Sequence, residues 1–367
     1  MSNPAVLADA DPEALAAFDM VIDVRSPAEF AEDHAPGAVN LPVLDDEERA
    51  RVGYIYVQES PFLARKVGGA LVAHNIARHL EGALAEMGKD FKPLVYCWRG
   101  GQRSNSMALV LAQVGWRVMV LGGGYKTWRR RVQARLYEQD LGLQLVLLDG
   151  GTGSGKTAVL QRLAAAGVQT LDLEALAAHR GSLFGALPGR AQPHQKGFET
   201  ALYMTLRALD PSRPVVVEAE SSRIGQLMTP PALWSAMAAA PRIELTAPRA
   251  ERARYLATTY DELTADRDAL KSLLARLPDR IGRARLAELS DMVDAGAFEA
   301  FADTLMEAHY DIAYVRSSKK DERPTLATVS LETLTAAALD EAAARVEAVV
   351  NHVESDNVPV PFPGSIG

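Results

Sequence analysis

In the first part of the chain, the residues best suited to chemistry surround its single cysteine. An apolar run ends at Cys97, and a helical pattern begins at Ser104. Backbone amides between a strand and a helix N-terminus can surround an anion, and nearby arginines lower the pKa of a thiol. Cys97 is therefore a candidate nucleophile, whereas a cysteine used only for packing needs neither glycines nor arginines beside it. The loop after it consists of Trp98, Arg99, Gly100, Gly101, Gln102 and Arg103.

A second candidate site has the spacing of a Walker A phosphate loop. An apolar strand precedes the loop and an amphipathic helix follows it, which is the context that the motif requires. Lys156 would supply positive charge, and Thr157 could bind Mg²⁺, the metal ion that we expect at this site. The pattern predicts a cradle for a diphosphate, which need not be ATP. The loop consists of Gly150, Gly151, Thr152, Gly153, Ser154, Gly155, Lys156 and Thr157.

The acidic half of this phosphate site carries a weaker signal. No apolar run ends in the aspartate of a Walker B motif. The nearest match is Glu218, which ends a short apolar run and is followed by Glu220 two residues later, and Asp172 at the end of the predicted strand 168–172 is another candidate. Because a metal ion beside the phosphates needs carboxylate ligands, these three residues are the candidates for the second half of the site.

The two loops belong to two predicted α/β domains. Apolar runs at 20–24, 93–96 and 116–121 predict strands of a parallel sheet, with a helix over 104–115. Further strands are predicted at 145–149, 168–172 and 214–218, and the chain beyond about residue 245 has mostly helical patterns. We expect a first domain over 1–135 with an insertion at about 45–80, and a second over 140–367. Ligands of such sheets bind at the carboxyl ends of the strands.

Composition excludes several classes of protein. The chain has 367 residues, and its one cysteine can form neither an internal disulfide nor a thiolate zinc cage, so no structural metal is expected. No apolar run approaches the roughly 18 residues of a membrane span, so no membrane partner is expected. The first twenty residues contain four acids and no Lys or Arg, which indicates neither a secretory signal nor a transit peptide. We therefore expect a cytoplasmic protein.

The formal net charge of −8 conceals a separation of charge along the chain. The first fifty residues are strongly acidic, whereas basic clusters follow later. One cluster adjoins Tyr125 and Trp128 and is the candidate for contact with a nucleic-acid backbone: Lys126, Arg129, Arg130 and Arg131. A second group of ten Lys and Arg residues lies between Arg242 and Arg285, where solvated helix faces are an equally good interpretation.

The cysteine loop alone fits either a phosphatase or a sulfurtransferase. The upstream segments 23–30 and 34–42 resemble the Asp-x-Arg, Glu-Phe and His-x-Pro-Gly-Ala motifs of the rhodanese family, with Asp33 in place of the glycine before His34. We expect His34 to be structural. The Cys-x5-Arg loop is one residue longer than the usual rhodanese loop, so a phosphate-bearing or selenium-bearing group is a better expected ligand than a bare sulfane sulfur.

A rhodanese-like domain with a long cysteine loop, fused to a P-loop NTPase-like α/β domain with a helical C-terminal part, resembles the bacterial tRNA 2-selenouridine synthase family. The resemblance includes both loops and the segments 60–66, 179–185 and 217–221. It implies a transferase that replaces sulfur by selenium at C2 of wobble 2-thiouridine in tRNA, using selenophosphate and geranyl diphosphate, through an S-geranyl intermediate. We infer that the cysteine loop binds selenophosphate and that the phosphate loop binds geranyl diphosphate.

Two other classes of function remain open from the sequence. A tRNA sulfurtransferase or cysteine-loop phosphatase coupled to a P-loop kinase would use the same two loops. A non-enzymatic, nucleotide-switched tRNA-binding protein would retain the loop with an inert cysteine of ordinary thiol pKa.

Overall fold

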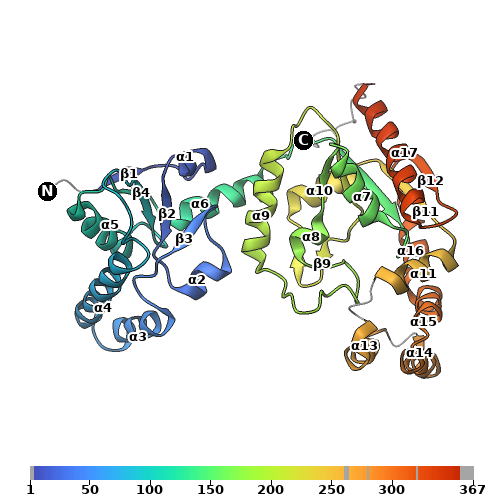
Figure 1. Ribbon diagram of the computed structural model, residues 1–367, viewed down its shortest axis with the longest axis horizontal. Coiled ribbons are helices and arrows are strands. Elements are labelled where there is room, and N and C mark those ends of the chain that lie inside the picture. The colour runs from blue at the N-terminus through green and yellow to red at the C-terminus, as the bar shows by residue number, and fades with distance from the viewer. Residues whose placement is uncertain (1–3, 260–263, 279–280, 320, 356–367) are drawn as a thin grey trace, which may run out of the picture. The chain divides into compact units, whose positions relative to one another are not determined.

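The computed structural model describes residues 4–259, 264–278, 281–319 and 321–355. The chain divides into two compact units (Figure 1). Unit 1 contains Met1–Gln139 and Pro193–Tyr203, and unit 2 contains Asp140–Gln192 and Met204–Gly367. No helix among the described residues is both long enough and apolar enough to cross a membrane.

Unit 1 is built on a five-stranded sheet in which neighbouring strands all pair in parallel. Its core is formed by apolar side chains from the central strands and from the helices that cover them. The strand order is β1 (Ala5–Leu7), β5 (Met119–Leu121), β4 (Pro93–Tyr96), β2 (Met20–Asp23) and β3 (Ala38–Asn40). The helices outside the insertion are α1 (Pro12–Ala16), α2 (Pro27–Glu32), α5 (Gln102–Val114) and α6 (Tyr125–Gln133), which continues as a π-helical turn, η1 (Ala134–Glu138).

The predicted insertion consists of two helices, α3 (Asp46–Gln58) and α4 (Pro61–Glu81), which pack side by side (Figure 1). Asp45 forms a capping box with Glu48 at the start of α3, and Ser60 caps the start of α4. The inner face of the pair buries Ile55 of α3 and Ala64 of α4. Both helices are therefore specified by local caps and by one buried face each.

Unit 2 contains a second five-stranded parallel sheet, which confirms the predicted fold class. The strand order is β12 (Thr325–Ser330), β11 (Arg242–Thr246), β6 (Leu145–Gly150), β8 (Val215–Glu218) and β7 (Gln169–Leu171), and a small hairpin is formed by β9 (Arg223–Ile224) and β10 (Leu227–Met228). The helices are α7 (Lys156–Ala165), α8 (Leu173–Ala177), α10 (Pro231–Ala239), α11 (Arg249–Thr259), α13 (Arg267–Leu274), α14 (Arg283–Ala295), α15 (Phe298–Leu305) with the π-helical turn η3 (Met306–Tyr310), α16 (Asp311–Ser318) and α17 (Ala336–Ser355).

One segment from the second half of the chain belongs to unit 1, which was not predicted from the sequence. Residues 193–203, which include the first part of α9 (Gln195–Ala208), belong to unit 1. Asp33, which replaces the rhodanese glycine, is 3% exposed and accepts a 2.7 Å hydrogen bond from the Tyr125 hydroxyl. Thr200 of α9 donates a second hydrogen bond to the same carboxylate. The substituted position thus provides an acceptor for α9.

Candidate functional site

The base of the cysteine loop rests on a buried ion pair from the Asp-x-Arg motif. The guanidinium of Arg25 bonds both carboxylate oxygens of Asp23, with its shortest contact at 2.6 Å. Arg25 also donates to the Asp33 carbonyl, and its guanidinium lies 4.0 Å from the centroid of the Tyr125 ring. Both charged side chains are fully buried. The motif therefore has a structural role, which is to fix the start of α6 beneath the loop.

Cys97 lies at the carboxyl end of β4 and directs its sulfur into the loop. Its Sγ accepts a 3.3 Å hydrogen bond from the Gly101 amide and lies 3.2 Å from the Ser104 hydroxyl. The cysteine carbonyl accepts a hydrogen bond from the Tyr125 amide at 2.8 Å. Strand, loop and helix thus hold the thiol in a nest of polar groups.

Two glycines are required by the close approach of this loop to the start of α6. A Cβ on Gly124, where φ is +60°, would lie 2.2 Å from the Cys97 carbonyl oxygen and 2.6 Å from the Gly100 amide. Gly100 has φ +67°, and a Cβ there would lie 2.9 Å from the Leu121 carbonyl oxygen. No larger residue fits either position without moving the loop.

The charged side chains around the cysteine loop are not equivalent. Arg103 bonds Glu29 of α2 at 2.7 Å, so its charge is already balanced. The Arg99 side chain is exposed and makes no ion pair or hydrogen bond with the residues that the structure describes. Lys196 of α9 lies 5.8 Å from the centroid of the Trp98 ring and bonds Glu32. Arg99 is thus the available cation of the loop, and Lys196 is a neighbour that the sequence analysis missed.

The polar nest favours the thiolate form of Cys97. Burial raises the pKa of the thiol, but hydrogen bonds from the Ser104 hydroxyl and from the amides of Ser104, Arg99 and Gly101 outweigh it. The net effect holds the Cys97 pKa below its ordinary value. A lowered thiol pKa is typical of a reactive cysteine, but its leading causes are the Ser104 hydroxyl and the loop amides and not the arginine side chains that were expected to lower it.

The phosphate loop has the backbone that an anion cradle requires. Gly153 and Gly155 adopt φ values of +78° and +83°, and α7 begins directly at Lys156. The Lys156 ammonium donates to the Gly150 carbonyl at 2.9 Å, which holds its charge over the loop. Arg252 braces the outside of the loop, because it bonds both the Thr152 carbonyl and the Asp311 carboxylate.

Three carboxylates gather beside this phosphate loop. One oxygen from each of Glu174, Glu218 and Glu220 lies within 4.8 Å of the others. The Thr157 hydroxyl lies 3.4 Å from Glu174. Burial raises the pKa of Glu174 to about 9, helped by the charges of the other two carboxylates. Burial also raises the pKa of Glu218 to about 7, which the Lys156 ammonium partly offsets.

The segment after α8 covers these carboxylates. Gly181 has φ +69°, and a Cβ there would lie 2.6 Å from one oxygen of Glu220 and 2.9 Å from one of Glu174. The carbonyl of Gly185 accepts from the Arg180 amide at 2.8 Å, which closes the segment into a compact turn. The 179–185 segment therefore shields the carboxylate cluster from water, which explains their raised pKa values.

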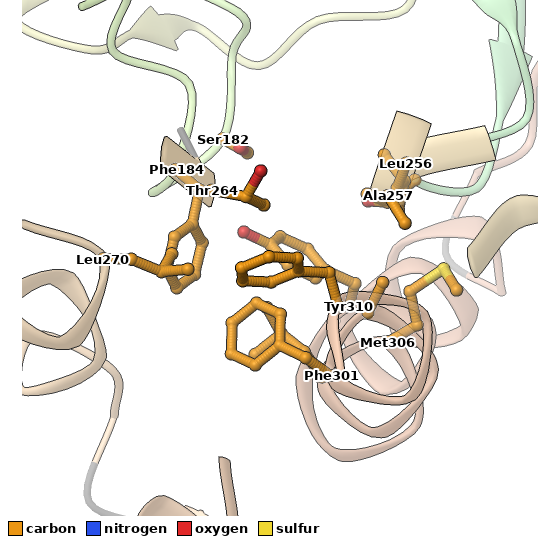
Figure 2. A pocket seen from close by; sticks show the side chains of 13 residues that line it. Ser182, Phe184, Leu256, Ala257, Thr264, Leu270, Phe301, Met306 and Tyr310 are labelled. Atoms are coloured by element: carbon orange, nitrogen blue, oxygen red, sulfur yellow. The ribbon is translucent and has the colours of Figure 1, made fainter. Parts of the chain in front are cut away.

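An apolar cavity opens at the phosphate loop within unit 2. Figure 2 shows the rings of Phe184, Phe301 and Tyr310 around it, with the hydroxyl groups of Ser182 and Thr264 nearby. No charged side chain is among the described residues that line the cavity. The described residues that line it are Thr152, Ser182, Phe184, Leu256, Ala257, Thr264, Leu270, Phe298, Phe301, Ala302, Leu305, Met306 and Tyr310.

Two protein-family models match the chain. Residues 143–344 match the tRNA 2-selenouridine synthase AAA domain, and residues 7–131 match the rhodanese-like domain. A tRNA 2-selenouridine synthase of Nitrosomonas europaea is 33% identical over 333 residues, which cover 86% of this chain and 86% of that protein. The chain belongs to the tRNA 2-selenouridine synthase family.

Two further similarities cover less of this chain. A tRNA 2-selenouridine synthase of Aeromonas salmonicida is 38% identical over 243 residues, covering 65% of this chain and 64% of that protein. Among solved structures, a rhodanese-related protein from Thermoplasma volcanium is 19% identical, with a TM-score of 0.23, over 35% of this chain and 92% of that one. A TM-score this low supports no conclusion about function.

The carboxylate site of this family member differs in one residue from the expected set. Asp172 caps α8, because its carboxylate accepts a 2.8 Å hydrogen bond from the Ala175 amide. Glu174, two residues later, takes the place beside Glu218 and Glu220. Its position in the sequence could have identified Glu174, because the residue follows β7 at the same sheet edge as the phosphate loop.

Some of the basic residues predicted to contact tRNA form ion pairs within unit 1. Arg129 pairs with Glu199, and Arg131 pairs with Asp9 and Asp11. A guanidinium engaged by a carboxylate is poorly available to a phosphate, so only Lys126 and Arg130 remain exposed candidates. The later basic group is largely paired as well, through contacts such as Arg242–Asp149, Arg249–Asp303, Arg252–Asp311, Lys271–Asp294 and Arg285–Glu288, and Arg280 lies outside the described residues.

We predict that iodoacetamide alkylates Cys97 with a midpoint below the pKa of about 8.5 of a free cysteine. Ser104→Ala should move the midpoint to higher pH, because it removes a hydrogen bond that stabilises the thiolate. The rate of alkylation against pH measures both effects, and Cys97→Ser provides the background. Identical midpoints for the wild type and Ser104→Ala would contradict the role given to Ser104.

We predict that the carboxylate cluster makes stability depend on pH and Mg²⁺. The folded state holds protons on Glu174 and Glu218 that the unfolded state releases, so without metal the free energy of unfolding falls as pH rises from about 5 to about 9. Glu218→Gln should raise that free energy at about pH 8 by on the order of 2 kcal/mol.

Mg²⁺ competes with the protons on these carboxylates, so it should raise the melting temperature more at about pH 8.5 than at about pH 6. Calorimetry of the wild type and Glu218→Gln measures this difference. Asp172→Asn keeps the α8 cap and every carboxylate of the cluster but removes a nearby negative charge, so it is the control for loss of charge alone. A shift from Mg²⁺ that is independent of pH, or unchanged in Glu218→Gln, would show that the cluster does not bind the ion.

Proposed function

We propose that this protein replaces sulfur by selenium at C2 of wobble 2-thiouridine in tRNA. In the proposed route, unit 2 transfers a geranyl group from geranyl diphosphate to the sulfur, and unit 1 directs selenium from selenophosphate to C2. The observation that carries the proposal is the apolar cavity beside the phosphate loop, because it suits a diphosphate with a hydrocarbon tail.

The first step forms a bond between the thiouridine sulfur and C1 of the geranyl group. The C1–O bond of geranyl diphosphate breaks, pyrophosphate departs, and the N3 proton of the base is released. Lys156 and the loop amides stabilise the charge that builds up on the departing pyrophosphate. The cavity would hold the geranyl chain and keep water from C1, which limits hydrolysis of the diphosphate.

The residues beside Thr157 suit a magnesium ion. Both carboxylate oxygens of Glu218 are buried without a hydrogen-bond partner among the described residues, which is costly unless a cation or a proton meets them. Glu174, Glu218, Glu220 and the Thr157 hydroxyl offer the oxygen ligands that Mg²⁺ prefers. When bound there, Mg²⁺ would supply further positive charge to the diphosphate.

The second step uses the cysteine loop. Alkylation makes the sulfur a leaving group. The selenium of selenophosphate forms a bond to C2, the C2–S bond breaks to release geranylthiol, and water then cleaves the Se–P bond to release phosphate. Arg99 and the loop amides are suited to the phosphate group of selenophosphate, and Arg103 fixes the loop through Glu29. Cys97, with its lowered pKa, lies in this loop, where its thiolate can help to direct the selenium to C2 of the base.

We predict that each loop performs a separable step. Lys156→Ala should lower geranylation by roughly 10²-fold to 10³-fold, because the charge on the leaving pyrophosphate loses a donor, and Thr157→Ala should act in the same direction. Cys97→Ser removes the nucleophile but keeps the loop, so it should stop selenium insertion and let S-geranyl tRNA accumulate.

Mass spectrometry of tRNA nucleosides, after incubation with geranyl diphosphate and selenophosphate, gives the ratio of geranylated to selenated product. Normal selenouridine from Cys97→Ser would mean that selenophosphate attacks the geranylated base without the thiol. Normal geranylation by Lys156→Ala, with loss of an ATPase activity, would mean that the phosphate loop serves a nucleotide.

We predict that Ala257→Phe, which fills the cavity from α11, weakens binding of geranyl diphosphate roughly tenfold but leaves pyrophosphate binding unchanged. Isothermal titration with each ligand measures the two dissociation constants. Ala250→Phe lies on the same helix outside the cavity and is the matched control. Equal affinities of Ala257→Phe and the wild type for geranyl diphosphate would place the geranyl chain elsewhere.

A further inference from the structure

The insertion in unit 1 exposes a concentration of large apolar side chains. Fifteen such side chains are exposed among the described residues, and five of them lie between positions 54 and 63. Single exposed apolar residues are ordinary, whereas a cluster marks a contact surface. The five are Tyr54, Tyr56, Val57, Phe62 and Leu63, with exposures of 65%, 56%, 75%, 70% and 37%.

Packing of the insertion does not account for these side chains. Helices α3 and α4 are joined by their inner faces, where Val52 lies against Gly68 and Ile55 is buried. On α3, Tyr54 and Val57 are three residues apart and share the outer face. The exposed rings therefore add nothing to the core, and their exposure needs another explanation.

The same part of the insertion carries unbalanced positive charge. The first turn of α3 is acidic, with Asp46, Glu47 and Glu48, but beyond it residues 50–80 contain four Arg and Lys residues and one acid, Glu59. Arg51, Arg65 and Lys66 are exposed and form no ion pair with any residue that the structure describes. This differs from the paired arginines of α6 and α11.

Each of the two helices carries a basic side chain about one turn away from an exposed aromatic ring. Arg51 precedes Tyr54 by three residues on α3, and Phe62 precedes Lys66 by four on α4, so each pair shares one helix face. Aromatic rings that stack on bases, beside cations that contact phosphates, are the means by which proteins hold single-stranded nucleic acid.

We propose that this insertion surface, Arg51, Tyr54, Phe62, Arg65 and Lys66, binds unpaired nucleotides of the anticodon loop of the tRNA substrate. The inference rests on the proposed function for the identity of the RNA. A second copy of the chain would also cover the apolar residues, but two such surfaces would bring like charges together. The unpaired cations therefore favour an anionic partner.

The test uses the full chain and a fluorescent anticodon stem-loop that contains 2-thiouridine. Tyr54→Ser with Phe62→Ser should raise the dissociation constant at least about fivefold without changing its salt dependence. Arg51→Ala with Arg65→Ala and Lys66→Ala should weaken binding and lower the slope of log K against log salt by about 2.

A matched control removes three other exposed charges of unit 1 that lie near the amino ends of β4 and β5: Lys89→Ala, Lys92→Ala and Arg117→Ala. Smaller losses in the control than in the insertion variants support the surface. Equal affinity of the insertion variants and the wild type overturns the surface alone. Dissociation of a dimer in the ring variant, with RNA affinity kept, reassigns the surface to a second copy, and failure of every protein to bind the stem-loop overturns the proposed function as well.

Discussion

A protein that binds and releases a multiply charged anion needs donors that converge on it without permanent negative charges in the way. Backbone amides at the carboxyl end of a buried parallel strand meet this need, provided that the chain can turn sharply into a helix. Both units use this arrangement, with Gly100 and Gly124 in one and Gly153 and Gly155 in the other. The glycines are therefore a condition for either site.

The two loops then differ in how their surroundings tune charge. Around Cys97, amides and a hydroxyl converge on one sulfur and lower its pKa despite burial. Around the phosphate loop, three carboxylates are buried together, and burial, reinforced by the charges of the other two carboxylates, raises the pKa of Glu174. The first environment stabilises an anion of the protein, whereas the second is unfavourable until protons or a cation arrive. One site is thus prepared as a nucleophile and the other as a receptor for positive charge.

Three strands of each sheet and both loops could be predicted from sequence because they depend on local patterns: apolar runs, glycine spacing and helix starts. The strands β1, β3, β11 and β12 were not predicted, and β12 lies in the part of the chain that was expected to be mostly helical. Asp172 and Glu174 show the limit of prediction from local sequence patterns. Both follow β7, and only the geometry of α8 decides that Asp172 caps a helix while Glu174 turns toward Thr157. The apolar cavity was also beyond prediction, because its walls come from five separate stretches of chain between Thr152 and Tyr310.

The single departure from the rhodanese pattern at Asp33 has consequences for the whole of unit 1. A glycine there would place no polar side chain in the interior. A buried carboxylate instead needs hydrogen-bond donors, and Tyr125 and Thr200 provide them. Thr200 lies on α9, which also brings Glu199 to Arg129 and Lys196 to the neighbourhood of Trp98. A segment that ended at residue 139 would leave the Arg129 charge without its carboxylate. The cysteine site is therefore completed by residues almost a hundred positions further along the chain, which is a physical reason for a chain that encodes both units together.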